Sequence, residues 1–175
     1  MRRPVDAARV RAFMRALGRE ADRAGRAYFT GGSTAVLLGW RDSTIDIDLK
    51  LEPESDRLLR AIADLKERLD LNLELAAPDQ FIPELPGWRE RSKWIAREGK
   101  LDFHHYDVYA QALAKIERGH AQDRNDVEQM IARQLVEPAE LERRFDEIEP
   151  LLYRFPAIDA PSFRRAVEAV TRRAR

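Results

Sequence analysis

The sequence predicts an α+β fold, in which a small mixed β-sheet packs against an N-terminal helix and a set of C-terminal helices. Apolar residues near the N-terminus recur at helical spacing. Between residues 27 and 108, short apolar or alternating segments are separated by turns and by further helical patterns. From residue 109 onward the patterns are helical. Strands that alternate with helices, followed by helices alone, are typical of an α+β protein.

The N-terminal half contains three predicted helices and three predicted strands. An amphipathic helix is expected over residues 6–25, where Gly25 would end it. Residues 71–75 alternate with period two, so a half-buried strand would present Asn72 and Glu74 on its polar face. The remaining elements are strand 27–29, helix 34–38, strand 44–51 and a helix that follows Ser55.

The C-terminal half is expected to hold a loop, a hairpin and four helices. Residues 78–92 include three prolines and one glycine, which predicts a loop without regular structure. A hairpin is expected from strands 94–96 and 101–108, and the helices are 109–118, 123–135, 138–152 and 162–172. We expect a single domain over residues 1–175, with a core at about 26–130 and a helical appendage at about 137–175.

Composition narrows the class of protein. The chain has no cysteine, which excludes disulfides and thiol nucleophiles, and it has no apolar run long enough to span a membrane. We therefore expect a soluble cytoplasmic protein. The net charge is zero, so there is no strong DNA-binding signal. Arginines are concentrated in residues 2–26 and 161–175, either as solvated helix faces or as a basic rim for RNA or an acidic partner.

Residues 28–50 contain the candidate metal- and phosphate-binding groups. Asp46 and Asp48 are two positions apart on a predicted strand, so their carboxylates lie side by side, while Ile45, Ile47 and Leu49 would face the core. Adjacent like charges are unfavourable unless a cation stands between them, and Mg²⁺ (or Mn²⁺) is suited to carboxylate oxygens.

A glycine turn precedes this strand. Gly31 and Gly32 permit close backbone approach, and Ser33 or Thr34 can begin a helix. The free N–H groups and positive dipole end of such a helix favour phosphate. Together with the paired acids, the turn predicts a site for a nucleoside triphosphate and its metal ion.

These motifs resemble a known superfamily. Gly31-Gly32-Ser33, twelve intervening residues and then Asp46-Ile47-Asp48-Leu49 resemble the signature of the DNA-polymerase-β-like nucleotidyltransferases. The run from Arg41 to Asp48 is similar to that of small bacterial members, which include the AbiEii-type toxins. A later helical motif of that group is matched by Lys115, Arg118, Asp123 and Asp126.

The resemblance implies a nucleotidyltransferase core that moves an NMP from an NTP to a hydroxyl of a protein or RNA, in a toxin–antitoxin or regulatory setting. It implies three metal-binding carboxylates, Asp46, Asp48 and a third for which Glu74 is the candidate and Asp102 and Asp107 the alternatives. The nucleotide-binding residues would be Gly31, Gly32, Ser33, Arg41, Thr44 and Lys115. The alternative is an inactive nucleotide- or partner-binding module, antitoxin-like, with a cognate partner protein.

The three histidines do not predict a zinc site. His104 and His105 are adjacent on a predicted strand and must point to opposite faces. One of the two is therefore expected to pack inside the protein.

Overall fold

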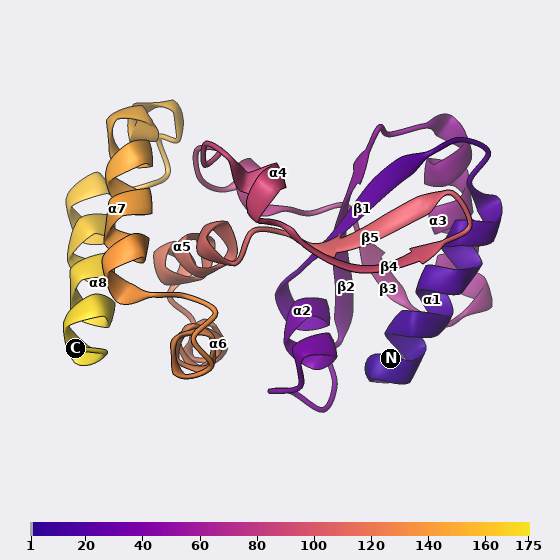
Figure 1. The fold of residues 1–175 in the computed structure, drawn as a ribbon, viewed down its shortest axis with the longest axis horizontal. Coiled ribbons are helices and arrows are strands. Elements are labelled where there is room, and N and C mark those ends of the chain that lie inside the picture. Colours follow the sequence, from indigo (N-terminus) through magenta and orange to yellow (C-terminus); the bar gives the residue numbers. More distant parts are fainter. Residues whose placement is uncertain (1) are drawn as a thin grey trace. The chain divides into compact units, whose positions relative to one another are not determined.

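The structure is a computed structural model that describes residues 2–175, and within them the chain forms two compact units (Figure 1). Unit 1 contains the residues up to Ala77 together with Ser92–Tyr106. Unit 2 contains Pro78–Arg91 and Asp107–Arg175.

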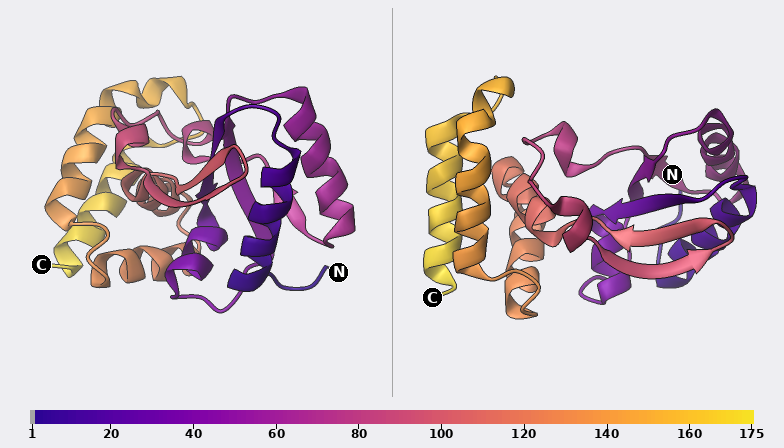
Figure 2. Two further views of the ribbon diagram at one scale, coloured as in Figure 1. Left: turned by 45° about the vertical axis from the view of Figure 1, so that its right-hand side comes forward. Right: turned by 45° about the horizontal axis from the view of Figure 1, so that its top comes forward.

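Unit 1 is built on a five-stranded mixed sheet with the strand order β3-β2-β1-β5-β4 (Figures 1 and 2). β1 is antiparallel to β2 and parallel to β5, while β2 is parallel to β3, and β4 is antiparallel to β5. The predicted α+β class and mixed sheet are confirmed. The strands are β1 (Gly25–Thr30), β2 (Asp46–Glu52), β3 (Asn72–Glu74), β4 (Lys93–Glu98) and β5 (Leu101–His105).

Helices α1 (Ala7–Glu20) and α3 (Asp56–Arg68) pack on one another and share a core with the apolar side of this sheet (Figure 1). The third helix of the unit, α2 (Gly31–Leu38), connects β1 to β2. The core is formed by alternate strand residues and by the apolar stripes of the helices, and includes Phe13, Leu17, Phe29, Leu49, Leu65 and Phe103. Apolar side chains that recur every second residue in the strands therefore pack against those that recur every 3.6 residues in the helices.

Helix α1 is shorter than the predicted range 6–25. Asp6 caps its N-terminus by accepting a hydrogen bond from the backbone N of Arg9 at 2.9 Å. The helix ends at Glu20, and Ala21 is already extended. Gly25 belongs to β1, so the residues between them must turn the chain onto the sheet.

Two arginines of the N-terminal cluster bind the C-terminal end of α3. Arg2 Nη1 donates to the Lys66 carbonyl at 2.7 Å, and Arg9 Nη2 donates to the Leu69 carbonyl at 2.7 Å. The last carbonyls of a helix have no partner within the helix, and cationic donors stabilise them. These two arginines therefore have a structural role.

Unit 2 is helical. Two short helices, η1 (Pro78–Gln80) and α4 (Trp88–Arg91), lie in the segment expected to be a loop. The predicted helix 138–152 divides into α7 (Pro138–Ile148) and the 3₁₀ segment η2 (Glu149–Arg154), because Pro150 has no N–H to continue the α-helical pattern. The other helices are α5 (Val108–Arg118), α6 (Ala121–Ala132) and α8 (Ala160–Arg173).

Helices α7 and α8 lie side by side (Figures 1 and 2), joined by an edge-to-face contact of Phe145 and Phe163 with ring centroids 4.8 Å apart. Helix α5 packs against α6, α7 and α8 and is the centre of this unit. No helix between residues 2 and 175 is both long and apolar enough to cross a membrane.

Candidate functional site

The acid-bearing strand alternates in burial as predicted. Ile47 and Leu49 are fully buried, whereas Asp46 and Asp48 are half-buried and point to the other face of the sheet. The expectation that Ile45 faces the core is wrong, since its side chain is 51% exposed. Strand β2 begins only at Asp46, so the alternation of the sheet does not extend back to Ile45.

Glu74 is the register partner of Asp48. In the parallel pair of β2 and β3, Asp46 is opposite Asn72 and Asp48 is opposite Glu74. Paired residues of neighbouring strands are about 5 Å apart and point to the same face. The Asn72 Nδ2 donates a hydrogen bond of 2.9 Å to Asp46 Oδ1, which holds that carboxylate in place. The two aspartates and Glu74 therefore share one polar surface at this end of the sheet.

Asp102, one alternative to Glu74, lies on the far side of β1. It is opposite Arg26, which in turn is opposite Glu52, so it is level with the other end of β2. Arg97 donates two hydrogen bonds to its carboxylate, at 2.9 and 2.7 Å. These bonds to Arg97 lower the pKa of Asp102 to about 2 and keep it as an ion-pair partner.

Asp107, the other alternative, belongs to unit 2. Its Oδ1 caps α5 by accepting from the backbone N of Tyr109 at 3.1 Å. Its Oδ2 accepts from the Nη2 of Arg91 at 2.7 Å. Both carboxylate oxygens of Asp107 are therefore already engaged within unit 2. Glu74, which is opposite Asp48 in the register of β2 and β3, stays the stronger candidate for the third acid.

The glycine turn adjoins the acid strand. Gly31 begins α2 with a φ of +59°, and a Cβ built on it would lie 3.0 Å from Asp48 Oδ2. Such a backbone conformation is rarely adopted by residues with a side chain. The N-terminus of α2 and the Asp48 carboxylate are therefore immediate neighbours, as a site for a metal-bound phosphate requires.

The hydroxyls of Ser33 and Thr34 differ in their partners. Ser33 is fully buried, and its Oγ has no hydrogen-bond partner within residues 2–175. Thr34 Oγ1 donates to the Phe29 carbonyl at 3.3 Å and lies 3.1 Å from His105 Nδ1. A buried hydroxyl without a partner is unfavourable, so Ser33 is the better candidate for a phosphate oxygen.

The buried side chains of Thr34 and His105 contact one another beneath the glycine turn. The sequence did not predict this contact. Thr34 Oγ1 and His105 Nδ1 are within hydrogen-bond distance of one another, so the two side chains join α2 to β5. His105 is the histidine that packs inside, as predicted for one of the pair.

Thr44 packs against the turn. A Cβ on Gly32 would lie 2.6 Å from the Cβ of Thr44, so only glycine fits there. Thr44 Oγ1 also donates to the Asp46 carbonyl at 3.1 Å, and its backbone N–H donates to the Val5 carbonyl at 2.9 Å. These contacts position the turn relative to β2, while nucleotide contact by Thr44 stays a prediction.

Arg41 lies in the segment between α2 and β2, where its backbone N is 3.4 Å from the Ala35 carbonyl oxygen. This segment follows Gly39, which ends the helix with a φ of +89°. Contact between the Arg41 side chain and phosphate stays a prediction.

Lys115 lies in unit 2 and is buried in an ion-pair network. Its Nζ is 2.7 Å from Asp126 Oδ2 and 3.5 Å from Asp123 Oδ1. Burial opposes the charge on Asp123, but hydrogen bonds from Arg118 and the charge of Lys115 outweigh it and lower the pKa of Asp123. The network joins α5 to α6. Contact between Lys115 and nucleotide stays a prediction.

The metal donors available in unit 1 are carboxylate oxygens. Within residues 2–175, no three Asp, Glu or His side chains converge closely enough to form a complete metal site. Asp46, Asp48 and Glu74 nevertheless share a face, and oxygen donors of this type suit Mg²⁺ or Mn²⁺. In donor type these three side chains suit a hard divalent cation, and the metal site itself stays a prediction.

Comparison with known proteins identifies a nucleotidyltransferase family. Residues 8–175 match the model of a family described as nucleotidyltransferase of unknown function (DUF6036). No curated protein and no solved structure gave a match. The match covers nearly the whole chain, which therefore belongs to this family of nucleotidyltransferases of unknown function.

Proposed function

We propose that this protein is a metal-dependent nucleotidyltransferase that moves an NMP from an NTP to a hydroxyl of a protein or RNA acceptor. The observation that carries the proposal is the position of Asp48, which adjoins Gly31 of the turn and is opposite Glu74 in the register of β2 and β3. Membership of a nucleotidyltransferase family supports the reaction class.

The chain's residues would act mainly by binding and positioning. The N-terminal amides of α2 and the Ser33 hydroxyl would bind the terminal phosphates, and Arg41 would neutralise their charge. Asp46, Asp48 and Glu74 would hold Mg²⁺ or Mn²⁺, which when bound stabilises negative charge on the reacting phosphate. The acceptor hydroxyl gives its proton to solvent and its oxygen forms a bond to the α-phosphorus. The bond from the α-phosphorus to the bridging oxygen of the β-phosphate breaks, and pyrophosphate leaves with the two electrons of that bond.

The setting is a further part of the proposal. The run from Arg41 to Asp48 and the motif that begins at Lys115 resemble those of AbiEii-type proteins, which favours a toxin–antitoxin or regulatory role. A protein or RNA acceptor in the cytoplasm, and a cognate partner protein, fit that role.

The test is transfer of label from each α-³²P-labelled NTP, with Mg²⁺ or Mn²⁺, to the protein and RNA of a cell extract. We expect label transfer with at least one NTP, reduced about 100-fold or more in Asp48→Asn, because loss of a metal-binding carboxylate removes charge stabilisation at the reacting phosphate. The matched control is Asp102→Asn, which removes an ion-paired carboxylate from another strand of the same sheet. Absence of transfer with every NTP, or equal transfer by Asp48→Asn, would overturn the proposal.

The second candidate is an inactive module that binds nucleotide or a partner protein. The hydrogen bond from Asn72 to Asp46 favours it, because that carboxylate oxygen already has a partner within the protein. Calorimetric titration with Mg-NTP distinguishes the two. Binding that Asp48→Asn abolishes, together with the absence of any label transfer, would support the inactive module.

A further inference from the structure

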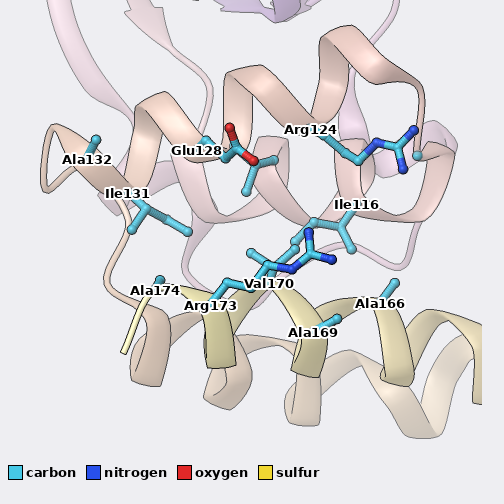
Figure 3. Close-up of a pocket in the computed structure, with 12 residues that line it drawn as sticks. Ile116, Arg124, Glu128, Ile131, Ala132, Ala166, Ala169, Val170, Arg173 and Ala174 are labelled. Carbon is cyan, nitrogen blue, oxygen red and sulfur yellow. The ribbon is translucent and has the colours of Figure 1, made fainter.

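Unit 2 contains an open groove of about 490 Å³ between α6 and α8 (Figure 3). Its floor includes Ile116 of α5. Helix α5 packs against both α6 and α8, whereas α6 and α8 make no extensive contact with one another. The groove is therefore a space on the surface of α5 that is bounded by two helices.

The two walls present matching helical stripes. On α6 the stripe runs from Arg124 through Val127 and Ile131. On α8 it runs from Ala166 through Ala169 and Val170. On each wall the lining positions recur at intervals of three and four residues, over about two turns or 12 Å. This is the spacing at which the ridges of a third helix interdigitate.

Small residues line much of α8. Ala166 and Ala169 of α8 line the groove, together with Ala174 just beyond its C-terminal end and Ala132 of α6 (Figure 3). Alanine side chains leave room for a packed helix to approach the walls closely. The apolar surface of the groove is not covered by larger side chains of its own walls, and such an exposed apolar surface is typical of interaction sites.

Three charged side chains border the apolar surface: Arg124 and Glu128 on α6 and Arg173 on α8 (Figure 3). None of the three has a hydrogen bond or ion pair with any side chain of residues 2–175, although most other arginines of unit 2 are paired. Arginines at the rim of an apolar groove attract carboxylates on a bound partner. With two arginines against one glutamate, the rim has a net positive charge and favours a helix that carries acidic side chains beside its apolar stripe.

We propose that the groove binds one amphipathic helix of a partner protein, with its apolar stripe between α6 and α8 and its acidic side chains facing Arg124 and Arg173. This mode of recognition, in which apolar positions i, i+3, i+4 and i+7 enter a groove, is known for many helix-binding proteins. The site lies within unit 2, so the proposal does not depend on catalysis in unit 1.

The probe is a synthetic helical peptide of about 18 residues, with leucines at helical spacing and flanking glutamates, compared with the same peptide carrying lysines in place of the glutamates. Binding to the full chain is measured by fluorescence anisotropy at two salt concentrations. The binding site is located by changes in the backbone amide NMR signals. The variants are Ala169→Trp, which fills the groove, and Arg124→Glu combined with Arg173→Glu. The control is Ala139→Trp on α7, an exposed alanine outside the groove.

The proposal expects the glutamate peptide to bind at least 10-fold more tightly than the lysine peptide, with signal changes confined to α5, α6 and α8. Ala169→Trp and the double charge reversal should each weaken binding at least 10-fold, and the reversal should favour the lysine peptide. Ala139→Trp should bind as the unmodified chain does. Equal binding of both peptides, or signal changes elsewhere, would overturn it.

Two further measurements identify another occupant. Dodecanoate that binds the groove where neither peptide does would assign it to a small amphiphile. Self-association in sedimentation that Ala169→Trp abolishes, without peptide binding, would assign it to a second copy of the chain. Either result would overturn the proposal.

Discussion

Gly31 and Asp48 are packed so closely that a methyl group on the glycine would lie 3.0 Å from an oxygen of the Asp48 carboxylate. The two residues come from α2 and β2 and are seventeen positions apart in the sequence. This contact places the N-terminal turn of a helix, with its positive dipole end, against the carboxylate that would hold a metal ion.

Gly31→Ala is expected to destabilise the fold and to weaken nucleotide binding. The positive φ of +59° alone should reduce the free energy of unfolding by about 1 kcal/mol. The added methyl group would also displace Asp48, so Mg-NTP affinity should fall about 10-fold, measured by calorimetry. Gly39→Ala is the control, since its φ is +89° but the added Cβ meets no atom of a more distant segment of residues 2–175 within 4 Å. Equal losses of affinity in both variants would show that the contact with Asp48 is unimportant.

Gly32→Ala is expected to be more severe, because the new Cβ would overlap the side chain of Thr44. Overpacking of this kind reduces the free energy of unfolding by about 1–3 kcal/mol, measurable by urea denaturation. Thr44→Gly removes the overlapping atoms, so the double variant should recover about 1 kcal/mol or more relative to additivity. Strict additivity of the two substitutions would contradict close packing of Gly32 against Thr44.

Mg²⁺ should stabilise the protein through the acids at the end of β2. The carboxylates of Asp46, Asp48 and Glu74 repel one another, and a bound cation relieves that repulsion. We expect Mg²⁺ to raise the midpoint of thermal unfolding of the unmodified chain and to have little effect on Asp48→Asn. Glu52→Gln, at the far end of the same strand face, should respond as the unmodified chain does. A response that Asp48→Asn retains would place the metal elsewhere.

Lys115→Met should be strongly destabilising. It would remove the cation 2.7 Å from the buried carboxylate of Asp126 and one of the two cations beside buried Asp123, at about 3–5 kcal/mol. Arg118→Met, whose side chain is 60% exposed, should lower the free energy of unfolding by about 1 kcal/mol or less. Combining Lys115→Met with Asp126→Leu should recover part of the loss in chemical denaturation, and a double variant no more stable than Lys115→Met would contradict the network.

His105 should make stability depend on pH. Burial, together with the charges of Lys93 and Arg11, lowers the pKa of His105 from 6.5 to about 4. In the unfolded chain the imidazole binds a proton below about pH 6.5, whereas the folded protein resists protonation until about pH 4. Stability is therefore full above pH 6.5 and falls by up to about 3 kcal/mol as the pH drops from 6.5 to 4.

The measurement is chemical denaturation across this pH range. His105→Asn can still donate to Thr34 through its amide, so it should lose most of the histidine contribution while retaining a folded state. The matched control substitution is His120→Asn, at an exposed position. An unchanged slope in His105→Asn would show that another group is responsible.

The pattern of residue types along the chain is enough to predict the local elements and the chemical groups of the site. Apolar periodicity predicts α1, α3 and the sheet core, because burial must follow the repeat of each element. The same reasoning places Asp46 and Asp48 on one strand face. It fails at Ile45, since the end of a strand is decided by pairing with its neighbours. It also misses α4, which lies in a proline-containing segment.

Relations between distant residues were decided only by the tertiary structure. No local pattern shows that β3 pairs with β2 in the register that sets Glu74 opposite Asp48, because strand register depends on the packing of both strands. The contact of Gly31 with Asp48 and the hydrogen bond of Thr34 with His105 likewise arise from segments brought together by the sheet. The sequence determined which chemical groups are present and which way each element faces, and the three-dimensional pairing of strands decided which of those groups meet.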